Sequence, residues 1–183
     1  MKLSVLVLDN VFDTGLSAVL DAFTTANELA ALQDPHARPF DITVVGMKRQ
    51  VRTALGMRMS VQPANAADGS DWIVVPALST KLPEQLVPAL GRRDVTDAMG
   101  RLRSWHADGS RVAASCIGTF LVAESGLLRD QEATTSWWLG PLFRQRYPEI
   151  RLDESRMLVP SGDFVTAGAA MGHLGAVPIS WTP

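Results

Sequence analysis

The sequence has little cysteine and histidine, and these two scarcities already exclude several kinds of protein. Its 183 residues include one cysteine, Cys116, so no disulfide can form within the chain, and a reducing cytoplasm is the expected location. The three histidines, His36, His106 and His173, lie far apart, and none has the spacing of metal ligands. We therefore expect neither a metal nor a bound cofactor.

Positive charge is also scarce relative to negative charge. The chain has 17 Lys and Arg residues against 19 Asp and Glu residues, which gives a formal net charge of −2. A chain that binds nucleic acid alone usually carries a basic excess or a basic stripe. The densest basic stretch, Arg92 and Arg93 with Arg101 and Arg103 nearby, is interpreted as a solvated helix face. We therefore expect no direct DNA binding by this chain alone.

Long apolar runs are missing as well. The first apolar run, residues 3–8, ends at Asp9, lacks a small-residue cleavage site after it, and is too short to cross a bilayer. No later segment reaches the roughly 18 apolar residues that a membrane helix needs, so no membrane association is expected. With 46% hydrophobic and 20% charged residues, the chain has enough apolar material for one globular core.

Short apolar runs alternate with segments of helical periodicity, which is typical of a mostly parallel sheet with helices on both faces. Residues 3–8 are continuously apolar, as in a strand buried on both sides, and residues 15–33 repeat apolar side chains every three or four positions. Further strands are predicted at residues 40–45, 72–76, 111–115 and 133–135, helices at 83–90, 95–108, 117–125 and 138–147, an irregular excursion or hairpin at 52–61, a hairpin at 157–167, and a last helix from 169 to 174.

The most informative segment follows the predicted strand at residues 111–115. Cys116 comes directly after this strand, and helical spacing begins at Ile117, with Gly118 next. A sharp turn from strand to helix presents one side chain above the sheet, where free amides of the first helical turn can lower a thiol pKa or bind an oxyanion. The alternative is a purely structural role, in which Cys116 is buried and packs as a small hydrophobic residue. Spacing alone leaves both interpretations open.

Other candidate residues follow neighbouring predicted strands, whose carboxyl ends meet at the edge where α/β sheets bind ligands. Asp9 and Asp13 follow the first strand and would share a proton with Cys116 or orient a ligand, although Asp13 equally suits a helix cap. Trp137 would form a pocket wall or pack in the core. We expect the Ile117 amide and an N–H from residues 77–78 to face the sulfur. The pocket candidates from this reasoning are Asp9, Asp13, Ala77, Leu78, Ile117, Gly118 and Trp137.

Residues 112–128, VAASCIGTFLVAESGLL, resemble the elbow segment of the ThiJ/PfpI superfamily. They resemble more closely the class I glutamine-amidotransferase-like domain at the N-terminus of AraC-family transcription regulators. Segments 12–16, 133–138, 142–150 and 166–171 agree in the same order, so the resemblance covers about residues 3–174. It implies a flavodoxin-like three-layer sandwich, Cys116 at a strand-to-helix elbow, a small-molecule ligand and a homodimer.

The sequence departs from this family in two places. Enzymes of the superfamily pair the elbow cysteine with a histidine in an Ala-Thr-Thr-His-Trp context, and this chain has Ser136 at that position. A serine hydroxyl cannot accept a proton from a thiol near neutral pH, so Ser136 becomes a further pocket candidate and thiol catalysis is in doubt. The second departure is that the family pattern ends at Leu174. We expect a domain at residues 1–174, an irregular tail at 175–183, and no helix-turn-helix module in this chain.

Two functional hypotheses follow from these patterns. The leading one is a ligand-sensing and dimerising regulatory domain of an AraC-type transcription regulator. The alternative is a ThiJ/PfpI-type cysteine enzyme that acts on a small electrophile, in the manner of an isonitrile hydratase or a glyoxalase. The residue at position 136 discriminates between them, because a histidine there would favour the enzyme.

Overall fold

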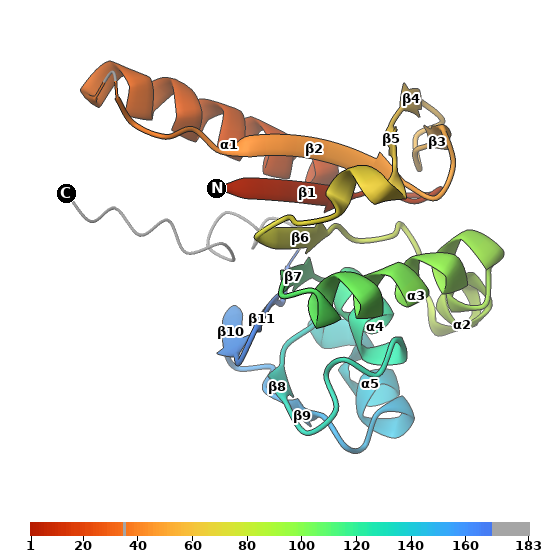
Figure 1. Cartoon of the computed structure of the whole chain (residues 1–183). Helices are drawn as coiled ribbons and strands as arrows, with labels where there is room; N and C mark the ends of the chain where they lie inside the picture. The colour runs from red at the N-terminus through yellow and green to blue at the C-terminus, as the bar shows by residue number, and fades with distance from the viewer. Residues whose placement is uncertain (35, 170–183) are drawn as a thin grey trace.

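A seven-stranded sheet forms the middle of the molecule in a computed structural model that describes residues 1–34 and 36–169 (Figure 1). The strand order is β10-β11-β7-β6-β1-β2-β5, and every neighbouring pair is parallel except β10 and β11. The strands are β1 Lys2–Leu6, β2 Asp41–Gly46, β5 Gln62–Pro63, β6 Trp72–Val75, β7 Arg111–Ser115, β10 Leu158–Ser161 and β11 Phe164–Ala167.

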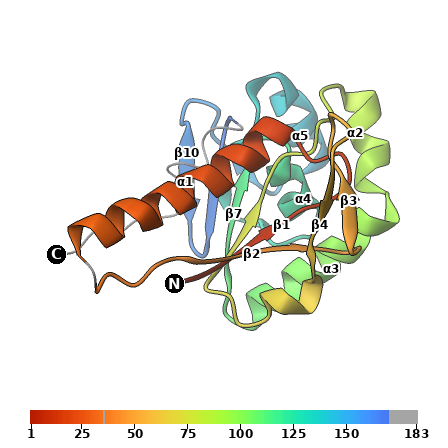
Figure 2. The same cartoon turned by 90° about the horizontal axis from the view of Figure 1, so that it is seen from above.

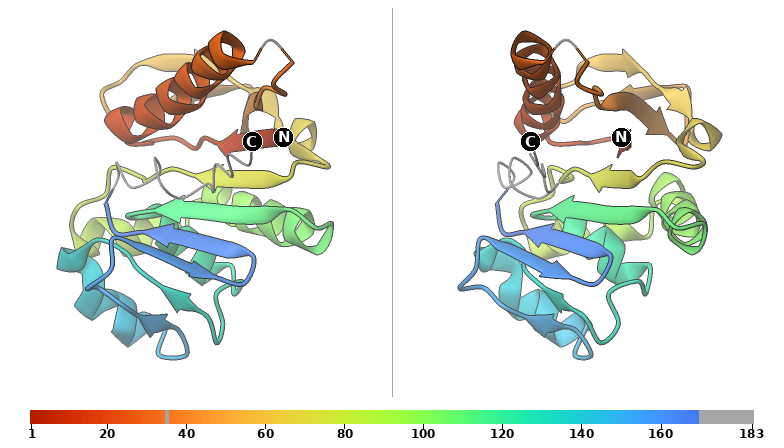
Figure 3. Two further views of the ribbon diagram at one scale, coloured as in Figure 1. Left: turned by 90° about the vertical axis from the view of Figure 1, so that its left-hand side faces the viewer. Right: turned by 60° about the vertical axis from the view of Figure 1, so that its left-hand side comes forward.

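Helices cover both faces of this sheet, with α1 and α3 on opposite sides (Figures 2 and 3). Because side chains alternate along a strand, Leu3 and Val5 pack in one apolar cluster with α1, whereas Leu6 belongs to the cluster that the other helices cover. The three-layer α/β sandwich predicted from the sequence is therefore confirmed. The helices are α1 Asp13–Gln33, α2 Pro83–Leu90, α3 Arg93–Ala107, α4 Gly118–Glu124 and α5 Gly140–Arg146.

Smaller elements account for the irregular segments. The predicted excursion at residues 52–61 is an antiparallel hairpin of β3 Gln50–Arg52 and β4 Arg58–Ser60. Two short 3-10 helices, η1 Ala64–Ala67 and η2 Trp137–Leu139, precede β6 and α5. The predicted strand at 133–135 is the short β8 Glu132–Ala133, paired with β9 Arg151–Leu152.

The first helix begins two residues earlier than its periodicity predicts, since Phe12 occupies the extended N-cap position and Asp13 lies in the first turn. The predicted last helix and tail lie outside the described residues, apart from Ala169. Among the helices of residues 1–34 and 36–169, none combines the length and apolar character that crossing a membrane requires. Over the same residues no three potential metal ligands come together.

The strand order creates a switch point between β1 and β6. From β1 the chain passes through α1 to β2 on one side, and it later returns to β6 on the other side of β1. Ligands of open α/β sheets bind outside the carboxyl ends of strands at such a point. Asp9 follows β1 there, and Cys116 follows β7, the strand beyond β6.

Candidate functional site

Cys116 forms a sharp turn between β7 and α4. Its φ of 53° lies in the left-handed region that residues other than glycine rarely adopt. Two hydrogen bonds hold it in that conformation: its N–H donates to the Ala167 carbonyl at 2.7 Å, and the Thr135 hydroxyl donates to its carbonyl at 2.7 Å. The predicted strand-to-helix elbow is therefore present, and the last residue of β11 and the segment after β8 brace it.

Gly118 allows the elbow to pack directly against the end of β6. A Cβ at this position would lie 2.3 Å from the Val75 carbonyl oxygen and 3.0 Å from the Pro76 carbonyl oxygen. No side chain fits in that space without moving one of the two backbones. The elbow and the carboxyl end of β6 are thus in van der Waals contact, which fixes the height of Cys116 above the sheet.

The Cys116 sulfur is enclosed, with 6% of the residue exposed. It lies 2.6 Å from the Ser136 hydroxyl oxygen and also accepts a hydrogen bond from the Ile117 amide. Burial raises the pKa of the Cys116 thiol above its ordinary value, and the hydrogen bonds from Ser136 and Ile117 only partly oppose this effect. At neutral pH the site therefore holds a neutral thiol rather than a thiolate.

Ser136 is fully buried beside this sulfur. Its hydroxyl can share a hydrogen bond with the thiol but cannot accept the thiol proton at neutral pH. Of the two histidines in the described part of the chain, His106 contacts the Ser110 carbonyl at 3.2 Å and packs against Phe164, and His36 is exposed. His173 lies outside the described residues. The described surroundings of the thiol therefore supply no imidazole.

The acidic candidates have partners other than Cys116. The Asp9 carboxylate accepts hydrogen bonds from Lys48 Nζ at 2.6 Å and from the Arg52 amide at 2.9 Å. Burial acts to raise the pKa of Asp9, but these two hydrogen bonds outweigh it and hold the pKa below its ordinary value. Asp13 is the first residue of α1, not its cap, and its Oδ2 accepts the Leu55 amide at 2.9 Å.

Ala77 and Leu78 are buried next to the elbow but connect to a different loop. The Ala77 carbonyl accepts the Phe12 amide at 2.8 Å, and the Ser79 amide donates to the Asn10 carbonyl at 2.8 Å. The loops that follow β1 and β6 are thereby tied together. Among the described residues, the sulfur has hydrogen bonds with Ser136 and the Ile117 amide, and none with the expected amide of residues 77–78.

Trp137 lies on the surface, with 75% of the residue exposed, so the interpretation as a core residue was wrong. It packs edge-to-face with Trp138 at a centroid distance of 6.0 Å. The two indoles line a cavity of about 400 Å³ that Thr135 also borders. Because the Thr135 hydroxyl bonds to the Cys116 carbonyl, this cavity lies one residue away from the elbow. The other lining residues are Thr134, Glu154, Ser155, Arg156, Met157, Gly168 and Ala169.

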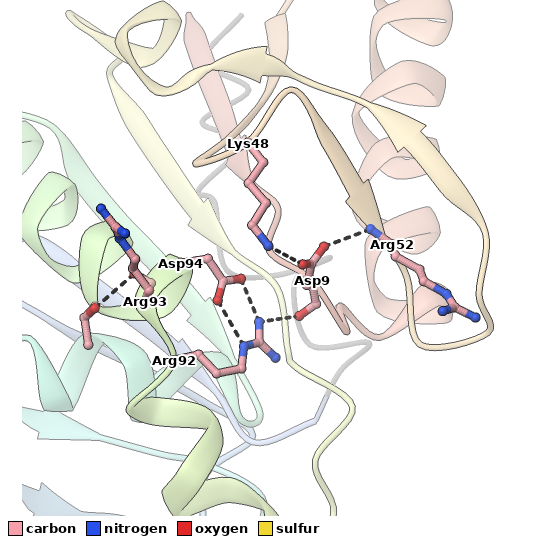
Figure 4. A network of polar contacts seen from close by, with 7 residues as sticks. Asp9, Lys48, Arg52, Arg92, Arg93 and Asp94 are labelled. Atoms are coloured by element: carbon pink, nitrogen blue, oxygen red, sulfur yellow. Dashed lines mark hydrogen bonds and ion pairs between the residues drawn. The ribbon is translucent and has the colours of Figure 1, made fainter.

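Sequence reasoning missed two contributors to this edge of the sheet. Thr135 braces the elbow backbone, and its only signal was its place beside Ser136. Arg92 is not a freely solvated residue, because its guanidinium binds the Asp94 carboxylate and the Asp9 carbonyl oxygen (Figure 4). The interpretation of Arg92 as part of a solvated helix face was therefore wrong, because Arg92 is the extended N-cap residue before α3 and its side chain reaches the loop after β1.

Comparison with known proteins places the fold. No family model and no curated protein matches the sequence. Solved structures do match: an AraC family transcriptional regulator from Pseudomonas putida has a TM-score of 0.70 at 20% identity, covering 96% of this chain and 87% of that one. A putative transcriptional regulator protein from Vibrio parahaemolyticus has a TM-score of 0.76 at 20% identity, covering 94% and 86%.

The same fold occurs in DJ-1 proteins. Oxidized DJ-1 from Toxoplasma gondii has a TM-score of 0.68 at 17% identity, covering 94% of this chain and 84% of that one. The chain has the DJ-1 fold. The resemblance carried by residues 112–128 is therefore confirmed at the level of the fold, which DJ-1 proteins share with the two regulators.

Proposed function

We propose that this chain is a ligand-sensing and dimerising regulatory domain of an AraC-type transcription regulator. In this proposal residues 1–174 form the regulatory domain as a homodimer, and DNA is contacted by a module outside them. The observation that carries the proposal is the pair formed by Cys116 and Ser136, whose sulfur and oxygen are 2.6 Å apart in a buried site. The likeness in fold to two transcriptional regulators supports it.

The chemistry of that pair argues against turnover. A thiol becomes a good nucleophile when a neighbouring base removes its proton or when its surroundings favour the thiolate. Ser136 offers no base, and burial raises the pKa of the Cys116 thiol. The elbow therefore suits a packed or slowly oxidised thiol that responds to the occupancy of the neighbouring cavity.

The cavity beside Trp137 and Trp138 is the ligand site in this proposal. Indole and methionine surfaces with a few polar groups are typical of small-molecule pockets, and a volume of about 400 Å³ accommodates a small metabolite. Thr135 would connect the two places, because it borders the cavity and donates to the Cys116 carbonyl. A ligand that moved Thr135 would thus disturb the elbow.

Fusion to a DNA-binding module that requires dimerisation tests the regulatory role. The chain fused to such a module should repress a reporter promoter, and a metabolite screen on the fusion should find a compound that changes repression. The Trp137→Ala variant should keep repression and lose the response, since Trp137 is exposed and contributes to the cavity rather than to the core. A fusion that stays monomeric in sedimentation and does not repress would contradict the proposal.

One observation favours the alternative, a ThiJ/PfpI-type cysteine enzyme. Cys116 has the left-handed φ of a nucleophile elbow, and the Ile117 amide points at its sulfur, as an oxyanion donor would. Turnover of methylglyoxal or an isonitrile at roughly 1 per second or more, abolished by Cys116→Ser, would establish the enzyme. Activity gained only in Ser136→His would instead show that the imidazole was the missing part.

A further inference from the structure

A second polar site lies at the carboxyl ends of β1 and β2, on the α3 side of the sheet (Figure 4). Asp9 follows β1, Lys48 follows β2, and Arg92 and Asp94 lie at the start of α3. These side chains border a cavity of about 630 Å³, together with Met47, Arg93 and Asp97. Neither Cys116 nor Ser136 takes part in it, so this anion cavity, as we name it, is separate from the elbow.

Arg92 is held rigidly in the wall of the anion cavity. Its Nε and Nη2 donate to the two Asp94 oxygens at 3.0 and 2.8 Å, and Nη2 also donates to the Asp9 carbonyl at 2.7 Å. Asp94 is itself buried, so it fixes the guanidinium from the protein side. The third nitrogen, Nη1, has no hydrogen bond to the described residues (Figure 4). A guanidinium held in this way keeps two N–H groups for a ligand at little cost in side-chain entropy.

The balance of donors and acceptors in the anion cavity favours a negatively charged ligand. All four carboxylate oxygens of Asp9 and Asp94 already accept a hydrogen bond from the protein. Lys48 Nζ has three N–H groups and donates one of them, to Asp9. That hydrogen bond raises the pKa of Lys48, so the amine stays charged at neutral pH. The third carboxylate of the lining, Asp97, is paired with Arg93 at 3.9 Å, and both side chains are largely exposed. Around Asp9 and Asp94, the unused groups are therefore cationic donors, which suit carboxylate and phosphate oxygens.

A second hollow extends the anion cavity along α3. It has a volume of about 530 Å³ and shares Met47, Lys48 and Asp97 with the first. Pro63, Ala64 and Gly100 give it uncharged wall segments. A molecule whose charged group met Arg92 and Lys48 would have room for an uncharged body in this second hollow.

We propose that the anion cavity binds a small molecule carrying a carboxylate or phosphate group, and that Arg92 and Lys48 bind this group. The uncharged part of the molecule lies over Met47 toward Pro63 and Ala64. The cavity lies at the carboxyl ends of the strands, next to the switch point between β1 and β6, and this edge of the sheet is where this class of fold binds ligands in general. The proposal goes beyond the regulatory role above and does not depend on it.

Calorimetric titration of the whole chain with inorganic phosphate, succinate and phenyl phosphate tests the proposal. Saturable binding is expected for at least one of them, and comparison of phosphate with succinate decides which oxyanion is preferred. Arg92→Gln should weaken that binding about tenfold or more, the loss expected for a charge-assisted contact. The matched control, Arg111→Gln, removes an exposed arginine at the start of β7 and should leave binding unchanged. The proposal would be overturned if no ligand bound saturably at millimolar concentration, or if Arg92→Gln bound the anion as tightly as Arg111→Gln.

Two further variants keep this test independent of folding, because Arg92→Gln also leaves buried Asp94 without its partner. Lys48→Gln changes a side chain that is 55% exposed, and it should weaken anion binding several-fold while the far-ultraviolet circular dichroism stays the same. Gly100→Leu introduces a side chain where a Cβ meets only Arg103 Nη2, at 3.9 Å. It should weaken phenyl phosphate but not inorganic phosphate, and equal effects on both would refute the placement of the uncharged body.

Discussion

The elbow and the anion cavity lie at the same edge of one sheet but are built by opposite means. The elbow is fixed by steric fit: Gly118 packs on the Val75 carbonyl, and a neutral thiol is enclosed by backbone and hydroxyl groups. The anion cavity is fixed by charge, since Lys48, Asp9, Arg92 and Asp94 hold one another through short hydrogen bonds. One region tolerates no added atom, and the other is open to solvent and to ligands.

This difference assigns different roles to the two regions. The tightly packed elbow has little room for a ligand, but a small movement of Thr135 or Ser136 would change its hydrogen bonds. A cavity with unused donors binds anions readily but transmits little by itself. Substitutions at the packed elbow should therefore cost more stability than substitutions at the solvated cavity.

The largest effect is expected from Gly118→Ala. One methyl group at this position would lie 2.3 Å from the Val75 carbonyl oxygen, so either α4 or the end of β6 must move. We expect a loss of about 3 kcal/mol in the free energy of unfolding, the upper range for overpacking a core. Urea denaturation followed by circular dichroism measures it.

Gly91→Ala is the matched control for this prediction. Its Cβ would lie 3.5 Å from the nearest neighbour, the Pro88 carbonyl, which is an ordinary contact distance. We expect a change within about 0.5 kcal/mol, as at a surface position without special geometry. Similar losses in both variants would mean that steric fit does not set the elbow apart.

The second prediction concerns the reactivity of Cys116. Because burial raises the pKa of this thiol above its ordinary value of 9.0, alkylation by iodoacetamide should be slow at neutral pH and should still accelerate above pH 9. At pH 8 the folded chain should react at least about tenfold more slowly than the urea-unfolded chain. A rate that levels off below pH 7 would instead reveal a thiolate and favour the enzyme.

The raised pKa of the Cys116 thiol also makes the free energy of unfolding depend on pH. Above pH 9 the unfolded chain ionises its thiol while the folded chain retains the proton, so stability decreases as pH rises through that range. Cys116→Ser removes this alkaline loss and the sensitivity to peroxide, and it should keep the fold because the two side chains are similar in size. A variant with an unchanged alkaline profile would show that Cys116 titrates as an exposed thiol.

Much of the elbow could be predicted from the sequence because its determinants are local. A small apolar strand, Cys116 and Gly118 follow one another within a few residues, and the apolar periodicity located β1, β6, β7 and the five helices. The two-residue strands β5, β8 and β9 have boundaries that no periodicity marks. Their pairing is decided by neighbours distant in the chain, which is why a strand was predicted at 133–135 instead of Glu132–Ala133.

The anion cavity could not be predicted in the same way. Lys48 lies 39 positions after Asp9 in the sequence, and Arg92 lies 83 positions after it. Only the order of the strands in the sheet brings the three residues together. Arg92 next to Arg93 has the pattern of an exposed basic face, and nothing local distinguishes the half-buried residue from the exposed one. Asp9 was found as a candidate from its place after a strand, but its partners depend on tertiary packing.

The smallest effect, and the last prediction, concerns the charge of Asp9. Hydrogen bonds from Lys48 and the Arg52 amide hold the pKa of Asp9 below its ordinary value of 3.8. A lowered carboxyl pKa contributes stability above the unfolded-state value, and that contribution is lost as pH falls through the lower, folded-state value. Asp9→Asn should therefore cost about 0.5 kcal/mol near neutral pH, a figure kept small because the pair is partly solvated.

Acid titration of stability in the two chains checks this prediction. The difference between wild type and Asp9→Asn should shrink as pH falls below about 4, and it should also shrink in about 1 M salt, which screens exposed charges. Asp97→Asn is the matched control, because it also removes one carboxylate from this cavity. The ion pair between Asp97 and Arg93 is long, at 3.9 Å, and both side chains are largely exposed. A larger loss for Asp97→Asn than for Asp9→Asn would mean that net charge, rather than the hydrogen-bonded network around Asp9, holds this edge of the sheet together.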